Sequence, residues 1–139
     1  MIIPSGVLAP YVISGFSGPG ALASQQVILG HRFPVLVTFV ANFAPITLAM
    51  FSSLGAFVDA AGMTVLNIDK CLSADDPTVG GNWVTIGTAT FSAGGHAASL
   101  ATAGGIDQVF DAYDHMRILG PTSPDSSLSQ IEITLVGKR

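Results

Sequence analysis

Charged residues are scarce in this sequence. Only 10% of its 139 residues are Asp, Glu, Lys or Arg, whereas 49% are hydrophobic, and the mean hydropathy is +0.59. A soluble protein typically carries about 25% charged residues, which keep its surface wet. We therefore expect much of the surface to be covered by something other than water, either lipid or other protein chains.

Basic residues and cysteine are also scarce in the sequence. The chain has five Lys and Arg against nine Asp and Glu, a net charge of -4, and its basic residues are scattered. Binding to nucleic acid needs clustered cations, so this pattern argues against a nucleic-acid partner. The single cysteine, Cys71, excludes an internal disulfide and a cysteine zinc cluster, and we interpret it as a small core residue.

Candidates for catalysis or metal binding are correspondingly few. The chain has one Glu and three His, and its best cluster is Asp111, Asp114 and His115. In an extended strand adjacent side chains point to opposite faces, so Asp114 and His115 would not converge on one ion. The acidic pair at residues 75–76 precedes a proline and predicts a turn rather than a calcium loop. The sequence thus predicts no catalytic, cofactor-binding or metal-binding residue, and a protein that is not an enzyme.

The last third of the chain predicts strands. In residues 129–136, Ile131, Ile133 and Leu135 alternate with polar residues, as in a strand with one buried face. Another predicted strand, residues 113–119, is separated from it by a turn-forming stretch with two prolines. Further short strands are predicted at residues 23–29, 63–69 and 83–91. Short strands with Gly and Pro between them predict an all-β fold, an antiparallel β-sandwich or jelly roll over residues 31–139.

Residues 33–58 form an uncharged run that is long enough for a membrane helix, which needs about 20 apolar residues. However, Asn42 and Pro45 lie near its middle, and no cluster of Lys or Arg flanks it. Two strands joined by a turn at residues 42–45 explain the run better. A membrane is therefore an unlikely partner, although a membrane segment stays open as an alternative.

Residues 1–30 contain no charged residue and are rich in Gly and Pro. We expect an extended N-terminal arm with no long regular element, preceding the β-sandwich domain. Its apolar side chains need cover, either on the arm's own domain or on a neighbouring subunit. The residues expected at such an interface are Ile2, Ile3, Val7, Leu8, Tyr11, Val12, Ile13 and Phe16.

Residues 82–138 resemble small virion structural proteins of tailed bacteriophages, meaning head decoration or cement proteins and related tail components. The resemblance lies in a tryptophan strand, an arginine strand and a terminal strand that closes with glycine, and Trp83 and Arg117 are the matching positions. The segments that carry it are residues 82–87, 90–91, 113–118 and 129–137. It implies a non-enzymatic β-sandwich located in the virion. Its partners would be further copies of itself, with a trimer as one arrangement, and a major capsid or other virion protein.

Two other functions remain open on the sequence alone. One is a small membrane-associated, holin-like protein that uses residues 33–58. The other is a β-sandwich that binds carbohydrate or a cell surface through an exposed site made by Trp83, Tyr113, His115 and Arg117. In the virion interpretation, by contrast, we expect Trp83 to be mostly buried.

Overall fold

The computed structural model describes residues 9–46 and 50–139, and this part of the chain is built from β-strands. The strands are β1 (Pro10–Phe16), β2 (Val27–Arg32), β3 (Val37–Phe39), β4 (Ser53–Val58), β5 (Thr64–Cys71), β6 (Trp83–Phe91), β7 (Ser99–Thr102), β8 (Gln108–Phe110), β9 (His115–Leu119) and β10 (Ser129–Lys138). The helical segments within the described ranges are single 3-10 turns, η1 (Ala41–Phe43), η2 (Gly80–Asn82) and η3 (Ala103–Gly105). The prediction of an all-β fold is confirmed.

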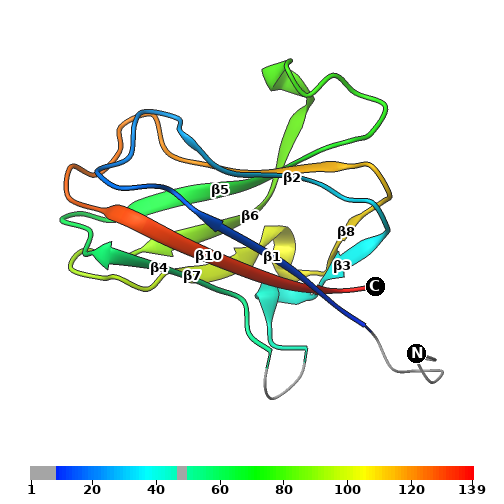
Figure 1. The fold of residues 1–139 in the computed structure, drawn as a ribbon, viewed down its shortest axis with the longest axis horizontal. Helices are drawn as coiled ribbons and strands as arrows, with labels where there is room; N and C mark the ends of the chain where they lie inside the picture. The colour runs from blue at the N-terminus through cyan, green and yellow to red at the C-terminus, as the bar shows by residue number, and fades with distance from the viewer. Residues whose placement is uncertain (1–8, 47–49) are drawn as a thin grey trace.

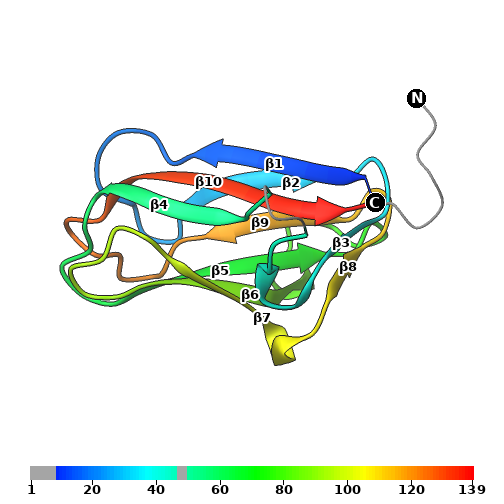
Figure 2. The same cartoon turned by 90° about the horizontal axis from the view of Figure 1, so that it is seen from below.

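The strands form two antiparallel sheets that pack face to face (Figures 1 and 2). Sheet A has the order β1-β10-β3-β8, with β4 also paired to β10, and sheet B has the order β2-β9-β5-β6-β7. Figure 2 shows the two layers, with β1 and β10 on one side and β5 and β6 on the other. The architecture is therefore the predicted β-sandwich.

Strand β10 is the centre of sheet A, and its alternation is as predicted. Ile131, Ile133 and Leu135 are buried between the sheets, whereas Glu132 is exposed on the outer face. The preceding strand β9 belongs to sheet B, so the proline-containing loop after β9 carries the chain from one sheet to the other. β9 and β10 are thus consecutive in the sequence but are not paired with each other.

The core between the sheets combines aliphatic side chains with a cluster of phenylalanines. Phe33 and Phe110 lie with their ring centroids 4.5 Å apart, and Phe39 lies edge-on to both. Phe33, Phe39 and Phe110 are fully buried. Aromatic rings in such offset or edge-on arrangements add to the stabilisation that burial alone provides.

The apolar run 33–58 supplies part of this core. It forms β3, the turn η1 and β4, and the predicted turn at residues 42–45 is confirmed, with Asn42 in the left-handed region at φ 55°. Its second strand, β4, begins at Ser53 and not directly after the turn, and residues 47–49 between them lie outside the described residues. Among the described residues, none of the helices has the length and apolar character that crossing a membrane would require.

The expectation of an arm without regular structure is wrong for residues 10–16. These residues form β1, which pairs with β10 along its whole length (Figure 1). The glycine and proline that argued against an element are compatible with this strand. Pro10 is its first residue, a position where a proline is tolerated. Gly15 leaves room for Leu29, whose Cδ1 atom would lie 3.0 Å from an added Cβ.

The predicted interface residues of the arm therefore have different places. Tyr11 packs against the core and Ile13 is buried in it, so these two stabilise their own chain. Val12 and Phe16 point outward and are about half exposed. The remaining predicted interface residues, Ile2, Ile3, Val7 and Leu8, lie outside the described residues.

Candidate functional site

A pocket of about 370 Å³ lies where β2, β9 and β6 come together on the outer face of sheet B. We call it the sheet B pocket. Its lining residues are Val27, Gly30, His31, Arg32, Pro77, Trp83, His115, Met116 and Arg117. Two rows of residues, each in register across the four adjacent strands β2, β9, β5 and β6, make up this part of the sheet. The rows are Arg32, His115, Cys71 and Trp83, and then Gly30, Arg117, Asp69 and Thr85.

Arg117 is held in place by contacts on two sides. Its Nε atom donates to Asp69 Oδ2 at 3.0 Å, and its guanidinium lies 4.3 Å from the ring centroid of Trp83. Asp69 is buried and also accepts a hydrogen bond from the Thr85 hydroxyl at 2.8 Å. The indole N–H of Trp83 in turn donates to the carbonyl of Pro77 at 2.8 Å. The walls of the pocket are therefore fixed by hydrogen bonds and stacking.

Trp83 is partly buried, in line with the prediction that most of it is covered, but it lies at the start of β6 on the outer face of sheet B rather than between the sheets. Its neighbours are the guanidinium of Arg117 and the ring of His115, whose centroid lies 6.5 Å from that of Trp83. Its cover therefore comes from polar and aromatic groups.

The structure brings together the four residues of the carbohydrate-binding alternative. Trp83, His115 and Arg117 line the sheet B pocket. Tyr113 is exposed beside it, and the guanidinium of Arg32, another lining residue, lies 4.9 Å from the Tyr113 ring centroid. The sequence did not indicate Arg32, because its place next to His115 depends on the pairing of β2 with β9.

His31 lies at the back of the pocket, on the side of the core. Its Nε2 atom is hydrogen-bonded to the Tyr11 hydroxyl at 2.7 Å, and its ring lies edge-on to Phe33. Burial lowers the pKa of His31 and raises the pKa of Tyr11, with the charge of Arg139 opposing the shift at Tyr11. Both groups are therefore neutral at pH 7 and act as a polar link between β1 and β2.

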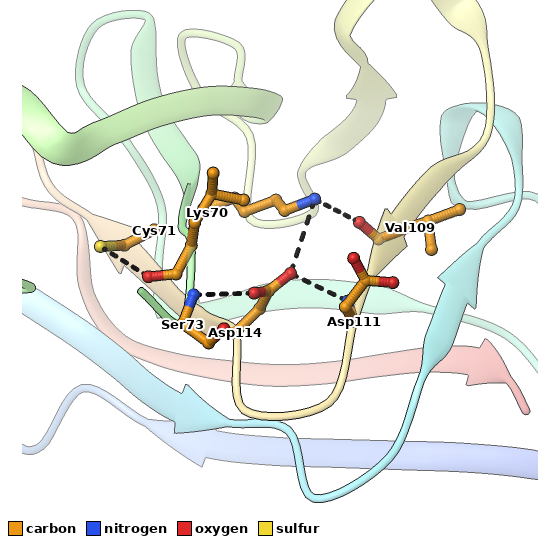
Figure 3. Close-up of polar contacts among 7 residues, drawn as sticks. Lys70, Cys71, Ser73, Val109, Asp111 and Asp114 are labelled. Atoms are coloured by element: carbon orange, nitrogen blue, oxygen red, sulfur yellow. Dashed lines mark hydrogen bonds and ion pairs between the residues drawn. The ribbon is translucent and has the colours of Figure 1, made fainter. Parts of the chain in front are cut away.

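The acidic cluster that the sequence indicated does not form a single site. Asp114 is 2% exposed. Its carboxylate accepts hydrogen bonds from the backbone N–H groups of Ser73 at 2.9 Å and Asp111 at 2.8 Å, and lies 3.7 Å from Lys70 Nζ (Figure 3). Asp114 is therefore not a solvated residue at the start of a strand, as an isolated surface carboxylate would be, but ties two loops together from inside. His115 lines the sheet B pocket instead. In the part of the chain that the structure describes, no three His, Cys, Asp or Glu side chains are placed to hold a metal ion.

Two other aspartates organise loops. The predicted turn at residues 75–77 is confirmed by Asp76, whose Oδ1 accepts hydrogen bonds from the Thr78 backbone N–H and hydroxyl, and these bonds lower the Asp76 pKa. Asp125 was not indicated by the sequence. Its carboxylate accepts from four backbone N–H groups, which lower its pKa strongly and join the loop before β10 to the turn before β5. The Asp-Ser-Ser sequence at 125–127 is the local signal for this motif.

The outer face of sheet A is a second surface of interest. It includes Val12, Ser14 and Phe16 on β1, Ser53, Gly55 and Phe57 on β4, and Glu132, Thr134, Val136 and Lys138 on β10, in the register of the sheet. Val12, Phe16 and Phe57 are 53%, 50% and 65% exposed. The charged residues of this set are Glu132 and Lys138.

Comparison of the chain with protein-family models, with curated proteins and with solved structures found no match.

Proposed function

We propose that this protein is a non-enzymatic structural subunit that assembles through protein contacts, as a capsid decoration or cement protein of a virion. The observation that carries the proposal is the outer face of sheet A, where Val12, Phe16 and Phe57 are at least half exposed and where, among the described residues, Glu132 and Lys138 are charged. Its partners would be other copies of the chain and a major capsid protein or another virion protein.

Burial of this face would be favourable. Covering an apolar side chain contributes about 25 cal/mol per Å², or about 1–2 kcal/mol for each half-exposed Val or Phe. Contiguous apolar surface on a soluble chain marks an interaction site, and permanent interfaces are more apolar than ordinary surfaces. A subunit in a particle has such surfaces covered by its neighbours, which explains why 10% charged residues suffice for the chain.

The edge of sheet A supports the same proposal. Strand β1 is the terminal strand of the sheet order, and its sequence PYVISGF contains no charged residue. Monomeric proteins commonly protect such an edge with Lys, a bulge or a covering segment, because its free backbone groups pair readily with another chain. An uncharged edge beside an apolar face suits a subunit that contacts copies of itself.

The proposal is tested by polar substitutions on this face. Phe16→Ser and Phe57→Ser should convert an oligomer to monomers without loss of the fold, because both side chains point away from the core. A matched control is Val84→Ser, which removes a 64% exposed apolar side chain on sheet B. Light scattering after size-exclusion chromatography measures the mass. Oligomers that persist in both Phe variants, or that are lost equally in the control, would refute the role of this face.

The virion location has a separate test. Particles of the phage that encodes the chain should contain it in many copies after purification by density gradient, as measured by mass spectrometry. If purified particles lack the chain, the proposed virion location is wrong, while the proposed oligomer still stands.

A further inference from the structure

The sheet B pocket has the features of a ligand-binding site, and it lies on the other sheet from the face proposed for assembly. We infer that it binds a small acidic sugar, a pyranose ring that carries a carboxylate. The inference rests on the charge of the pocket, the fixed orientation of its cations, the open floor at Gly30 and the aromatic wall at Trp83.

The pocket concentrates positive charge in a chain that has little. The chain carries five Lys and Arg and a net charge of -4, yet two of the five, Arg32 and Arg117, line this pocket. Asp69 compensates Arg117. Within the described residues, Arg32 has no carboxylate within 4.0 Å, so its charge is available to an anion. A carboxylate is a natural partner, because the guanidinium presents paired N–H donors that match its two oxygens.

Both guanidinium groups are held before any ligand arrives. Arg117 is stacked on Trp83, and Arg32 lies over the Tyr113 ring while its Nε donates to the Tyr113 carbonyl at 3.4 Å. A stacked guanidinium keeps its edge free for hydrogen bonds, whereas a freely rotating side chain loses rotamer entropy on binding. Such preorganisation distinguishes the pocket from a solvated surface with scattered arginines.

Gly30 leaves the floor of the pocket open. A Cβ atom added at this position would meet no other atom within 4 Å, and Gly30 is not in the left-handed region that favours glycine. A glycine inside a strand weakens the strand and often marks a place where a ligand approaches the backbone closely. The volume of about 370 Å³ lies at the lower end for ligand pockets and suits one or two sugar rings.

The aromatic wall favours a sugar over a simple anion. Arg117 covers one face of the Trp83 ring, and the part of the ring that stays exposed offers an apolar surface to the C–H face of a pyranose ring, which acetate or phosphate cannot use. His115 is a polar lining residue that can hydrogen-bond to hydroxyls. An acidic sugar would therefore use the cationic and aromatic sides of the pocket together.

The test uses the intrinsic fluorescence of Trp83, which is the only tryptophan of the chain and reports on the pocket alone. Glucuronic acid and N-acetylneuraminic acid are titrated into the full-length protein, with glucose and acetate as controls. We expect a saturable change with at least one acidic sugar below about 20 mM, because one charge pair and one stacked face give about millimolar affinity. Glucose and acetate should bind at least about tenfold more weakly.

Two variants locate the binding. Gly30→Leu fills the open floor and Arg32→Gln removes the free charge, and each should weaken binding about tenfold or more. Gly30→Leu should keep the circular dichroism spectrum and melting temperature, since the space is open. Lys138→Gln, on β10 of the opposite sheet, is the matched control for loss of one positive charge and should bind as the original chain does. The inference is overturned if no acidic sugar gives a saturable change, if glucose binds as well as glucuronic acid, or if both pocket variants bind normally.

The outcome is separable from that of the assembly proposal. Phe57→Ser lies on the opposite sheet and should leave sugar binding unchanged, while Gly30→Leu should leave the oligomer unchanged.

Discussion

The buried carboxylate of Asp114 gives the sharpest test of the structural account, because the sequence placed it beside Asp111 and His115 as one candidate site. Asp114→Asn should destabilise the fold, whereas Asp111→Asn and His115→Ala should have little effect on it. The reason is geometric. Asp114 is 2% exposed and its carboxylate accepts two backbone hydrogen bonds, but Asp111 is exposed and takes part through its backbone N–H and carbonyl groups.

The magnitude follows from the contacts that are lost. Asparagine can accept one of the two backbone hydrogen bonds with its single carbonyl oxygen, while its amide N–H groups face a second donor and Lys70 Nζ. Losing a hydrogen bond to a charged group costs about 1.5–3 kcal/mol. The unpaired charge of Lys70 adds little to this cost, because its ammonium still donates to the Val109 carbonyl and its side chain is 22% exposed to water. We expect a loss of about 2–4 kcal/mol in the free energy of unfolding.

Urea unfolding followed by Trp83 fluorescence and by circular dichroism measures these free energies. A Lys70→Met, Asp114→Asn double-mutant cycle isolates the coupling between the two side chains. If Asp114→Asn changes the free energy of unfolding by less than about 0.5 kcal/mol, or if Asp111→Asn costs as much, then the buried arrangement is wrong.

Three further predictions concern other parts of the chain. Backbone hydrogen bonds lower the pKa of Asp125 in the fold, so its contribution to the free energy of unfolding is complete above the unfolded pKa of about 3.9 and is lost as the pH falls below it. Asp125→Asn should therefore reduce the loss of stability at acid pH, as measured by urea unfolding at several pH values. A variant with the same dependence of stability on pH as the original chain would contradict this. Trp83→Ala should cost only about 1–2 kcal/mol and stay soluble, because the ring is partly exposed, and insoluble protein would contradict this. Deleting residues 1–20 should prevent folding because β1 pairs with β10, whereas deleting residues 1–8 should leave a folded chain. Circular dichroism measures both outcomes. If both shortened chains keep a β-sheet spectrum and unfold cooperatively on heating, β1 is dispensable.

The sequence predicted the strands whose pattern is local. Residues 129–136 show the period of two that one buried face requires, and the strands at 63–69 and 83–91 are confirmed as β5 and β6. Strand β1 was missed because glycine and proline normally interrupt strands. Here the absence of a side chain at Gly15 leaves space for Leu29. This contact joins two segments that are distant in the sequence, so no local pattern predicts it.

The sheet B pocket was partly predictable. The sequence indicated four residues suited to an exposed site, namely Trp83, Tyr113, His115 and Arg117. It did not show that their side chains lie close together in the fold. Their meeting depends on the order β2-β9-β5-β6, in which no strand pair except β5-β6 is consecutive in the sequence. Arg32 and Gly30 enter the site only through that order. Non-local strand pairing therefore limits what the sequence predicts of the site.

Sedimentation velocity of the full-length chain in detergent-free buffer, over a range of concentrations, measures whether the protein assembles through its apolar surface. We expect a discrete oligomer of folded subunits whose mass is a whole-number multiple of 14.2 kDa. A chain that sediments as a folded monomer at every concentration would contradict it.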